Sequence, residues 1–309
     1  MSFTESMRLL WVPGLTDCTG ARSWTTDRLF RTQVVTATSA TVNDFQLYVG
    51  NARNSHQYFA HEADRFASAA FESVLTGSRW ARNPRSTAWL LIRTYYAAFF
   101  SLHALMRLHG WACARLTAAH LTGINNDLTI TAPGSRRFDG GLYHVVSESG
   151  GRDLRCTPMG AAAGGTHEAL WSLFAPYFRT VNTAILSQGD PSLQPVVAAI
   201  DTFTALVDSY GGAKWFSTVR NRLNYAHDYG AWFPYSRSTS DYDRIESVLS
   251  KWVNAPDETI RLTNADELIH FTSACAFLVS LCGATIRDLH HRSRARSPFR
   301  LSSGMLINA

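Results

Sequence analysis

The segment from Ala88 to Leu108 constrains the fold of this 309-residue chain more than any other. Its sequence, AWLLIRTYYAAFFSLHALMRL, contains neither Gly nor Pro and would place apolar side chains almost all round a helix. A helix of this kind has to be covered on every side by other elements. We therefore predict a helix that is capped by Ser86, ends near Gly110 and lies at the centre of a helical bundle.

Apolar residues recur at intervals of three and four in six further segments, which predicts six more helices. Their approximate ranges are 54–77, 166–189, 196–210, 214–225, 241–254 and 263–290. The last of these contains the longest uncharged run, 271–286, which is 16 residues long. A membrane span needs about 20 predominantly apolar residues. We therefore expect a buried core helix and no membrane segment.

Two parts of the first half lack helical periodicity. Residues 1–50 contain short apolar runs at 9–12, 34–36 and 45–49, which predicts a few strands or an irregular arm. Residues 111–165 contain two predicted strands, 127–131 and 141–146, and then a Gly-rich stretch. The expected organisation is a mixed arm over 1–50 and a mainly α domain over 51–309, which a β and loop insertion interrupts at 111–165.

Composition indicates a globular protein that can bind a polyanion. The chain is 46% hydrophobic and 17% charged, and its formal net charge is +5. Lys occurs only at Lys214 and Lys251, so 27 of the 29 basic residues are Arg, whose planar fork suits phosphate. Five cysteines without a CxxC pair predict no disulfide framework. The apolar run near the N-terminus is too short for a secretory signal, so we expect a cytoplasmic protein.

Motifs for metals and cofactors are incomplete in this chain. His61-Glu62 and His167-Glu168 begin like the zinc protease motif, but both lack the second histidine. The Gly-rich segment 160–166 lacks the lysine of a phosphate-binding loop. We therefore expect neither a metal site nor a bound cofactor.

Residues 219–229, with the sequence VRNRLNYAHDY, carry the densest group of side chains that handle phosphate. A histidine titrates near neutrality and can transfer protons, and an arginine can stabilise negative charge on a phosphorane. Arg220 and His227 are two helical turns apart and share a face, whereas Arg222 and His227 are about 140° apart. The pair Arg222 and His227 therefore requires His227 at or beyond a helix end. Arginine and histidine at such an end also commonly cap carbonyls or bind a carboxylate, so the residues alone leave both interpretations open.

Two motifs resemble those of the HEPN superfamily. The pattern Arg222-x4-His227-x-Tyr229 resembles the R-x4-6-H motif of HEPN ribonucleases, including toxins that are paired with nucleotidyltransferase antitoxins. Arg220-Asn221 also fits the longer spacing. Upstream, residues 93–105 resemble the helix YYAxFHAAxALL of HEPN domains. These motifs cover about 25 residues, and the length and motif order also resemble the YaaC-like branch of the superfamily.

This resemblance implies a mainly α fold, a HEPN-like bundle that forms a homodimer with a composite RNA-cleaving site. His227 would be the general acid or base and Arg222 the phosphate clamp, with Arg220 as the alternative. Asn221 or Asn224 would orient the scissile phosphate. The expected substrate contacts are Asn224, Tyr225 and Tyr229. Tyr229 also matches the position that partner nucleotidyltransferases modify in some toxins.

The expected activity is therefore metal-independent RNA cleavage by a toxin or phage-defence effector, which leaves 2′,3′-cyclic phosphate ends. The expected partners are RNA, a second copy of the chain and an antitoxin or other regulatory protein. Leu223 departs from the family pattern, because a polar residue usually follows the arginine, and the 111–165 insertion is foreign to minimal HEPN domains. Two alternatives stay open: a non-catalytic HEPN-like module that binds nucleotides, RNA or protein, and a motif that only closes the bundle.

Overall fold

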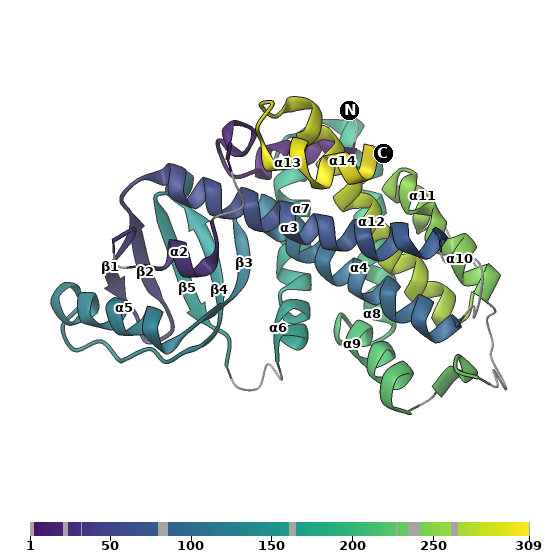
Figure 1. Ribbon diagram of the computed structural model, residues 1–309, viewed down its shortest axis with the longest axis horizontal. Coiled ribbons are helices and arrows are strands. Elements are labelled where there is room, and N and C mark those ends of the chain that lie inside the picture. The colour runs from purple at the N-terminus through teal and green to yellow at the C-terminus, as the bar shows by residue number, and fades with distance from the viewer. Residues whose placement is uncertain are drawn as a thin grey trace.

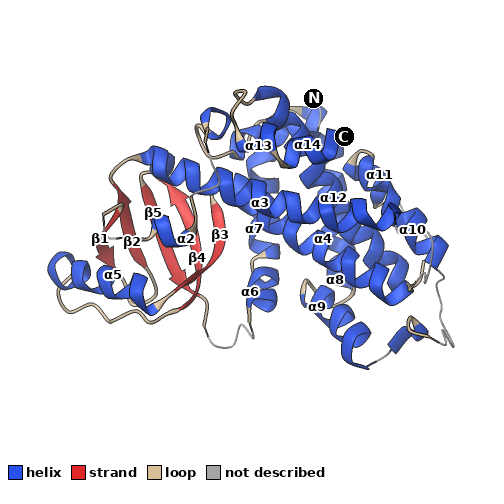
Figure 2. Cartoon of the chain, viewed as in Figure 1, coloured by secondary structure: helices blue, strands red, loops and turns tan. Residues whose placement is uncertain are grey.

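The computed structural model describes residues 3–20, 24–31, 33–79, 86–160, 165–226, 228–233, 242–260 and 265–308. The described residues are 67% helical and form one small antiparallel sheet. Figures 1 and 2 show the sheet at one end of the molecule and the helical bundle at the other. The predicted class, mainly α with a minor β component, is confirmed.

Three long helices form the centre of the bundle: α3 (Ala52–Arg79), α4 (Thr87–Leu108) and α12 (Glu267–Arg292). Helix α4 packs against both of the others, and nearly all of its side chains are buried. The hydroxyl of Ser86 caps its first turn by accepting a hydrogen bond from the Trp89 amide at 3.4 Å. The predicted central helix and its cap are therefore confirmed.

The other predicted helices also form. Their elements are α6 (Thr166–Ser172), α7 (Phe174–Leu186), α8 (Gln194–Ser209), α9 (Lys214–Asn221) and α10 (Tyr242–Ser250). The helix predicted over 166–189 is divided into α6 and α7 at Leu173. The other α-helices of the described residues are α1 (Phe3–Met7), α2 (Thr26–Leu29), α5 (Ala118–Thr131), α11 (Pro256–Thr259), α13 (Pro298–Leu301) and α14 (Ser303–Asn308).

The five strands are β1 (Val35–Ala40), β2 (Phe45–Val49), β3 (Trp111–Leu116), β4 (Gly141–Glu148) and β5 (Asp153–Pro158). Their order in the sheet is β1-β2-β5-β4-β3, and every neighbouring pair is antiparallel. Strand β2 therefore joins the N-terminal hairpin to the strands of segment 111–158. The apolar rings of Phe45, Phe138 and Tyr143 pack together in the core beside this junction.

One predicted strand is wrong. Residues 127–131 form the end of helix α5, because Leu121, Ile124 and Leu128 are buried at helical spacing whereas Ile130 is 81% exposed. The alternation of polar and apolar residues in DLTIT therefore does not mark the buried face of a strand. The run at 9–12 begins in a 3₁₀ turn, Arg8–Leu10, and pairs with no strand of the described sheet.

Helix α12 is long and apolar enough to cross a membrane, but 89% of its most apolar window is buried inside the protein. This burial is that of a core helix. Cys275 and Cys282 lie on this helix and are fully buried. All five cysteines are buried and free.

Candidate functional site

The phosphate-handling segment folds as an interrupted helix. Helix α9 ends at Asn221, a π turn follows at Arg222–Ala226, and a 3₁₀ turn spans Asp228–Gly230. His227 lies outside the described residues. Single π turns are rare and occur frequently at functional sites. Tyr229 has a φ of 70°, in the left-handed region that costs a non-Gly residue about 1–3 kcal/mol, which is a second such sign.

Arg222 is neutralised by two carboxylates. Its Nε donates to Oδ2 of Asp228 at 2.9 Å, and its Nη1 donates to Oε2 of Glu267 at 3.3 Å. The guanidinium also lies over the ring of Tyr229, 4.3 Å from its centroid. The hydrogen bond to Asp228 raises the pKa of Arg222, and the charges of Tyr229 and Glu267 raise it further. Arg222 thus makes the carboxylate contacts that are common for an arginine at a helix end.

Glu267, the first residue of α12, holds this turn together. Its Oε1 accepts a hydrogen bond from Nε1 of Trp215 at 3.0 Å. Its Oε2 accepts from Arg222 and, at 2.9 Å, from the hydroxyl of Tyr229. Burial raises the pKa of Tyr229, and the hydrogen bond to Glu267 raises it further. The strained backbone of Tyr229 is therefore fixed by a residue that is distant in sequence.

Replacing Glu267 by Ala is expected to lower the free energy of unfolding by about 1–3 kcal/mol. The substitution leaves Arg222, Tyr229 and Trp215 without their shared acceptor. Urea denaturation would measure this loss. The control is Glu168→Ala, which removes an exposed carboxylate from the first turn of α6 and should change stability by less than about 0.5 kcal/mol. Equal stability of the two variants would contradict the role assigned to Glu267.

Arg220 has a different environment, because its partners are neutral. Its Nη2 donates to the hydroxyl of Tyr96 at 3.0 Å, and its Nη1 donates to Oδ1 of Asn221 at 2.8 Å. Its Nε is buried and has no hydrogen-bond partner. Within the described part of the chain, no carboxylate lies within ion-pair distance of this guanidinium. Arg220 therefore carries a partly buried, uncompensated positive charge.

A histidine that sequence reasoning did not connect with this site lies on the other side of Tyr96. The rings of His167 and Tyr96 meet edge to face with centroids 5.7 Å apart. Nδ1 of His167 is 2.9 Å from the hydroxyl of Tyr95, which accepts a hydrogen bond from Nε1 of Trp171 at 3.1 Å. Burial lowers the pKa of His167, and the charge of Arg220 lowers it further, so its imidazole is neutral at pH 7.

The structure thus brings the predicted residues together in two groups. Arg220 and Asn221 are bonded to each other, and Arg220 lies 5.8 Å from the ring centroid of Tyr225, which is 74% exposed. Arg222 and Tyr229 belong to the second group, around Glu267. Asn224 is half-buried in the π turn between the two groups.

The departure from the family pattern at Leu223 has a packing reason. Its side chain is fully buried, and its carbonyl accepts a hydrogen bond from Nε1 of Trp232 at 2.7 Å. A polar residue here would have to be desolvated in the core. The neighbouring aromatic side chains differ in their exposure: Trp215 and Phe216 are buried, whereas Phe233 is 82% exposed.

Two polar residues of α4 outside this site have partners within the bundle. His103 is buried, stacks on Phe66 and lies with Nδ1 2.9 Å from Nη1 of Arg107. Arg93 is half-buried and donates from Nη2 to the carbonyl of Ser73 at 2.9 Å.

Among the residues that the structure describes, no three His, Cys, Asp or Glu side chains are grouped so that they could hold a metal ion. The chain was also compared with protein-family models, with curated proteins and with solved structures, and no match was found in any of the three comparisons.

Proposed function

We propose that this protein is a metal-independent endoribonuclease of the HEPN type, acting in the cytoplasm as a toxin or phage-defence effector. The observation that carries the proposal is the uncompensated guanidinium of Arg220 beside Asn221 and Tyr225. A cation that lacks a carboxylate partner is available to the anionic phosphodiester of RNA. The helical bundle around α3, α4 and α12 would be the HEPN-like domain, and two copies of it would form the composite site.

The chemistry needs one proton acceptor, one proton donor and one cation. The 2′-oxygen of RNA loses its proton to a base and attacks phosphorus, while the bond from phosphorus to the 5′-oxygen breaks and that oxygen receives a proton. The products are a 2′,3′-cyclic phosphate and a 5′-hydroxyl. In this proposal His227 is the acid or base, as the sequence motif implies, and Arg220 stabilises the charge on the non-bridging oxygens.

Arg222 receives a different role in this proposal from the phosphate clamp that the motif implies. Because Asp228 and Glu267 already neutralise it, its charge is less available to phosphate than that of Arg220. We assign Arg222 as a positioning residue that holds the π turn, and with it the segment that carries Asn224 and Tyr225. Arg220 is then the working arginine, which corresponds to the longer of the two family spacings.

A second candidate function is a non-catalytic module that binds single-stranded RNA. The exposed ring of Tyr225 next to Arg220 favours it, since an aromatic face and a cation together bind a base and its phosphate without any chemistry. This module would bind RNA tightly and lose affinity as salt is raised, and RNA would stay intact.

The deciding experiment compares RNA cleavage by the wild type and by His227→Ala in EDTA, with analysis of the product ends. We expect cyclic phosphate ends from the wild type, and a cleavage rate about 10²–10⁴-fold lower in the variant. His291→Ala is the control, because His291 is an exposed histidine at the end of α12. This variant should cleave RNA at the wild-type rate. Intact RNA with a well-folded wild type would favour the binding module, and unchanged cleavage by His227→Ala would contradict the assignment of His227.

A further inference from the structure

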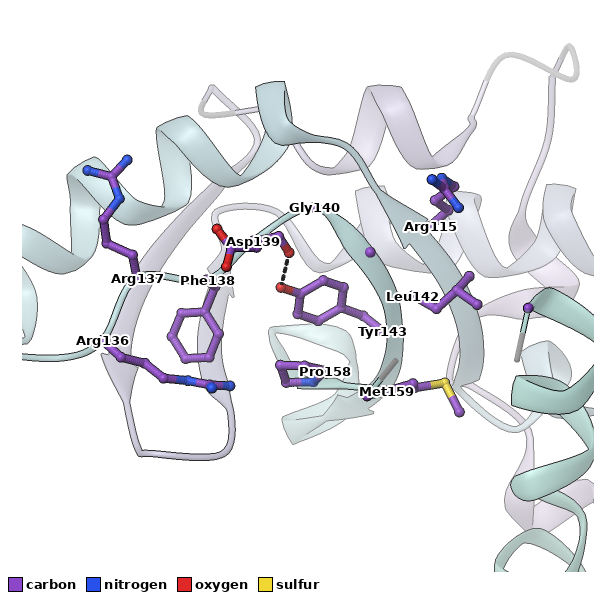
Figure 3. A pocket seen from close by; sticks show the side chains of 13 residues that line it. Arg115, Arg136, Arg137, Phe138, Asp139, Gly140, Leu142, Tyr143, Pro158 and Met159 are labelled. Carbon is purple, nitrogen blue, oxygen red and sulfur yellow. Dashed lines mark hydrogen bonds between the residues drawn. The ribbon is translucent and has the colours of Figure 1, made fainter. Parts of the chain in front are cut away.

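A pocket of about 530 Å³ opens beside strands β3 and β4 of the sheet. It shares no lining residue with the Arg220 site. Its volume lies within the range that is usual for small-molecule sites. Figure 3 shows its walls, which come from β3, β4, the end of β5 and the segment before β4. The lining residues that matter here are Arg115, Arg136, Arg137, Leu142 and Met159. None of them belongs to the RNA-cleavage motif.

The pocket has a positive charge that the described chain does not balance. Arg136 extends across the pocket beside Phe138, with its guanidinium carbon 4.7 Å from that ring's centroid, while Arg115 stands on the opposite wall and Arg137 points outward at the rim (Figure 3). No carboxylate of the described residues lies within ion-pair distance of these three arginines. Asp139 is the one acidic residue among those that line the pocket.

The apolar part of the lining is firmly held. The rings of Phe138 and Tyr143 are buried and pack against Phe45, with centroids 4.8 and 5.7 Å from its own. The hydroxyl of Tyr143 donates to the carbonyl of Asp139 at 2.6 Å. Met159 is joined to β4 by a hydrogen bond from its amide to the carbonyl of Leu142 at 2.8 Å. These contacts preform the pocket, so a ligand would not have to order it.

We propose that this pocket binds an organic phosphate of nucleotide size. The planar guanidinium of Arg136 can bind two oxygens of a phosphate monoester at once, and the other two arginines that line the pocket favour a dianion over the single charge of a carboxylate. Leu142 and Met159 offer an apolar surface to the body of the ligand, such as the flat face of a base. The carboxylate of Asp139 can accept hydrogen bonds from hydroxyl or amino groups of the same ligand. This proposal does not depend on the proposed ribonuclease activity.

Isothermal titration calorimetry at about 150 mM salt would test the proposal with adenosine monophosphate, adenosine and inorganic phosphate as probes. We expect the monophosphate to bind at least about 10-fold more tightly than either of the other two. Arg136→Gln should weaken its binding about 10-fold or more. Arg179→Gln, which removes an exposed arginine from α7 and the same unit of charge, should leave the affinity unchanged.

Thermal unfolding would verify that both variants are folded before they are titrated. A folded wild type that does not bind the monophosphate would overturn the proposal, as would equal affinities of Arg136→Gln and the wild type. If inorganic phosphate bound as tightly as the monophosphate, the organic part of the ligand would contribute nothing to binding, and the proposed organic ligand would be wrong. The phosphate could belong to the 5′ end of an RNA or to a free nucleotide, and a 5′-phosphorylated 2′-O-methyl oligonucleotide distinguishes these two sources. If the oligonucleotide competes with the monophosphate, the pocket binds an RNA end. If it does not compete, the pocket binds a free nucleotide.

Discussion

Substitution of Arg220 by Gln is expected to lower the single-turnover rate of RNA cleavage by about 10²–10³-fold, the usual cost of losing one donor to a developing oxyanion. The reason is that Arg220 has only neutral partners, Tyr96 and Asn221, and an Nε without any partner, so its charge is available to phosphate. Arg220→Lys should restore little of the rate, because an ammonium group lacks the planar fork. The assay is run in EDTA with the protein in excess over RNA.

The matched control for this experiment is Arg222→Gln. We expect it to lower stability, since Asp228 and Glu267 lose their shared cation, and to lower cleavage only as far as the π turn is disturbed. Urea denaturation of both variants separates loss of folding from loss of chemistry. If Arg222→Gln abolished cleavage at unchanged stability and Arg220→Gln remained active, the phosphate clamp would be Arg222, as the shorter family spacing implies.

Removal of the carboxylate of Glu62 is expected to cost about 3–5 kcal/mol of folding free energy, because it leaves a buried cation uncompensated. Glu62 on α3 and Arg107 on α4 are each only 2% exposed, and Oε2 of Glu62 lies 3.4 Å from Nε of Arg107. The other contacts of Arg107 are neutral: the carbonyl of Cys113 at 3.3 Å and the ring of His103. Burial and the charge of Arg107 lower the pKa of His103 well below its ordinary value, so this ring accepts a hydrogen bond and adds no charge.

The variant to measure is Glu62→Leu, by urea denaturation. Arg65→Leu is the control: Arg65 also pairs with Glu62, but about half of its side chain is exposed, so its loss should cost less than about 1 kcal/mol. The double variant Glu62→Leu/Arg107→Leu should recover most of the lost stability, because it removes both buried charges together. A double variant as unstable as Glu62→Leu would contradict this electrostatic account and indicate a packing defect.

The central helix could be predicted from sequence because its evidence is local. The apolar run of α4 and its cap at Ser86 lie within one stretch of chain. The sheet could not be predicted in the same way, since β2 pairs with β5 across about 100 residues and no local pattern specifies that register. The prediction of a strand over 127–131 is wrong because a segment of five residues is too short to distinguish strand alternation from the end of a helix.

The residues of the candidate site could be predicted from the sequence, but their contacts could not. The motif identified Arg220, Arg222 and their neighbours, yet helix geometry alone left the choice between the two arginines open. The difference between them comes from Glu267 on α12 and Tyr96 on α4, which only the tertiary fold brings to the motif. In the sequence His167 belongs only to an incomplete zinc motif, and nothing in its local sequence indicates that it faces Tyr96.

The strand order also has a consequence for synthesis on the ribosome. The hairpin of β1 and β2 is translated first, but β5, the strand that pairs with β2, follows about 100 residues later. At about 5–20 residues per second this delay lasts roughly 5–20 s. An isolated two-stranded hairpin is at best marginally stable in water, and its unpaired edge can associate with other chains. The nascent chain therefore passes through an interval in which binding of its first 50 residues by a chaperone would protect it from aggregation.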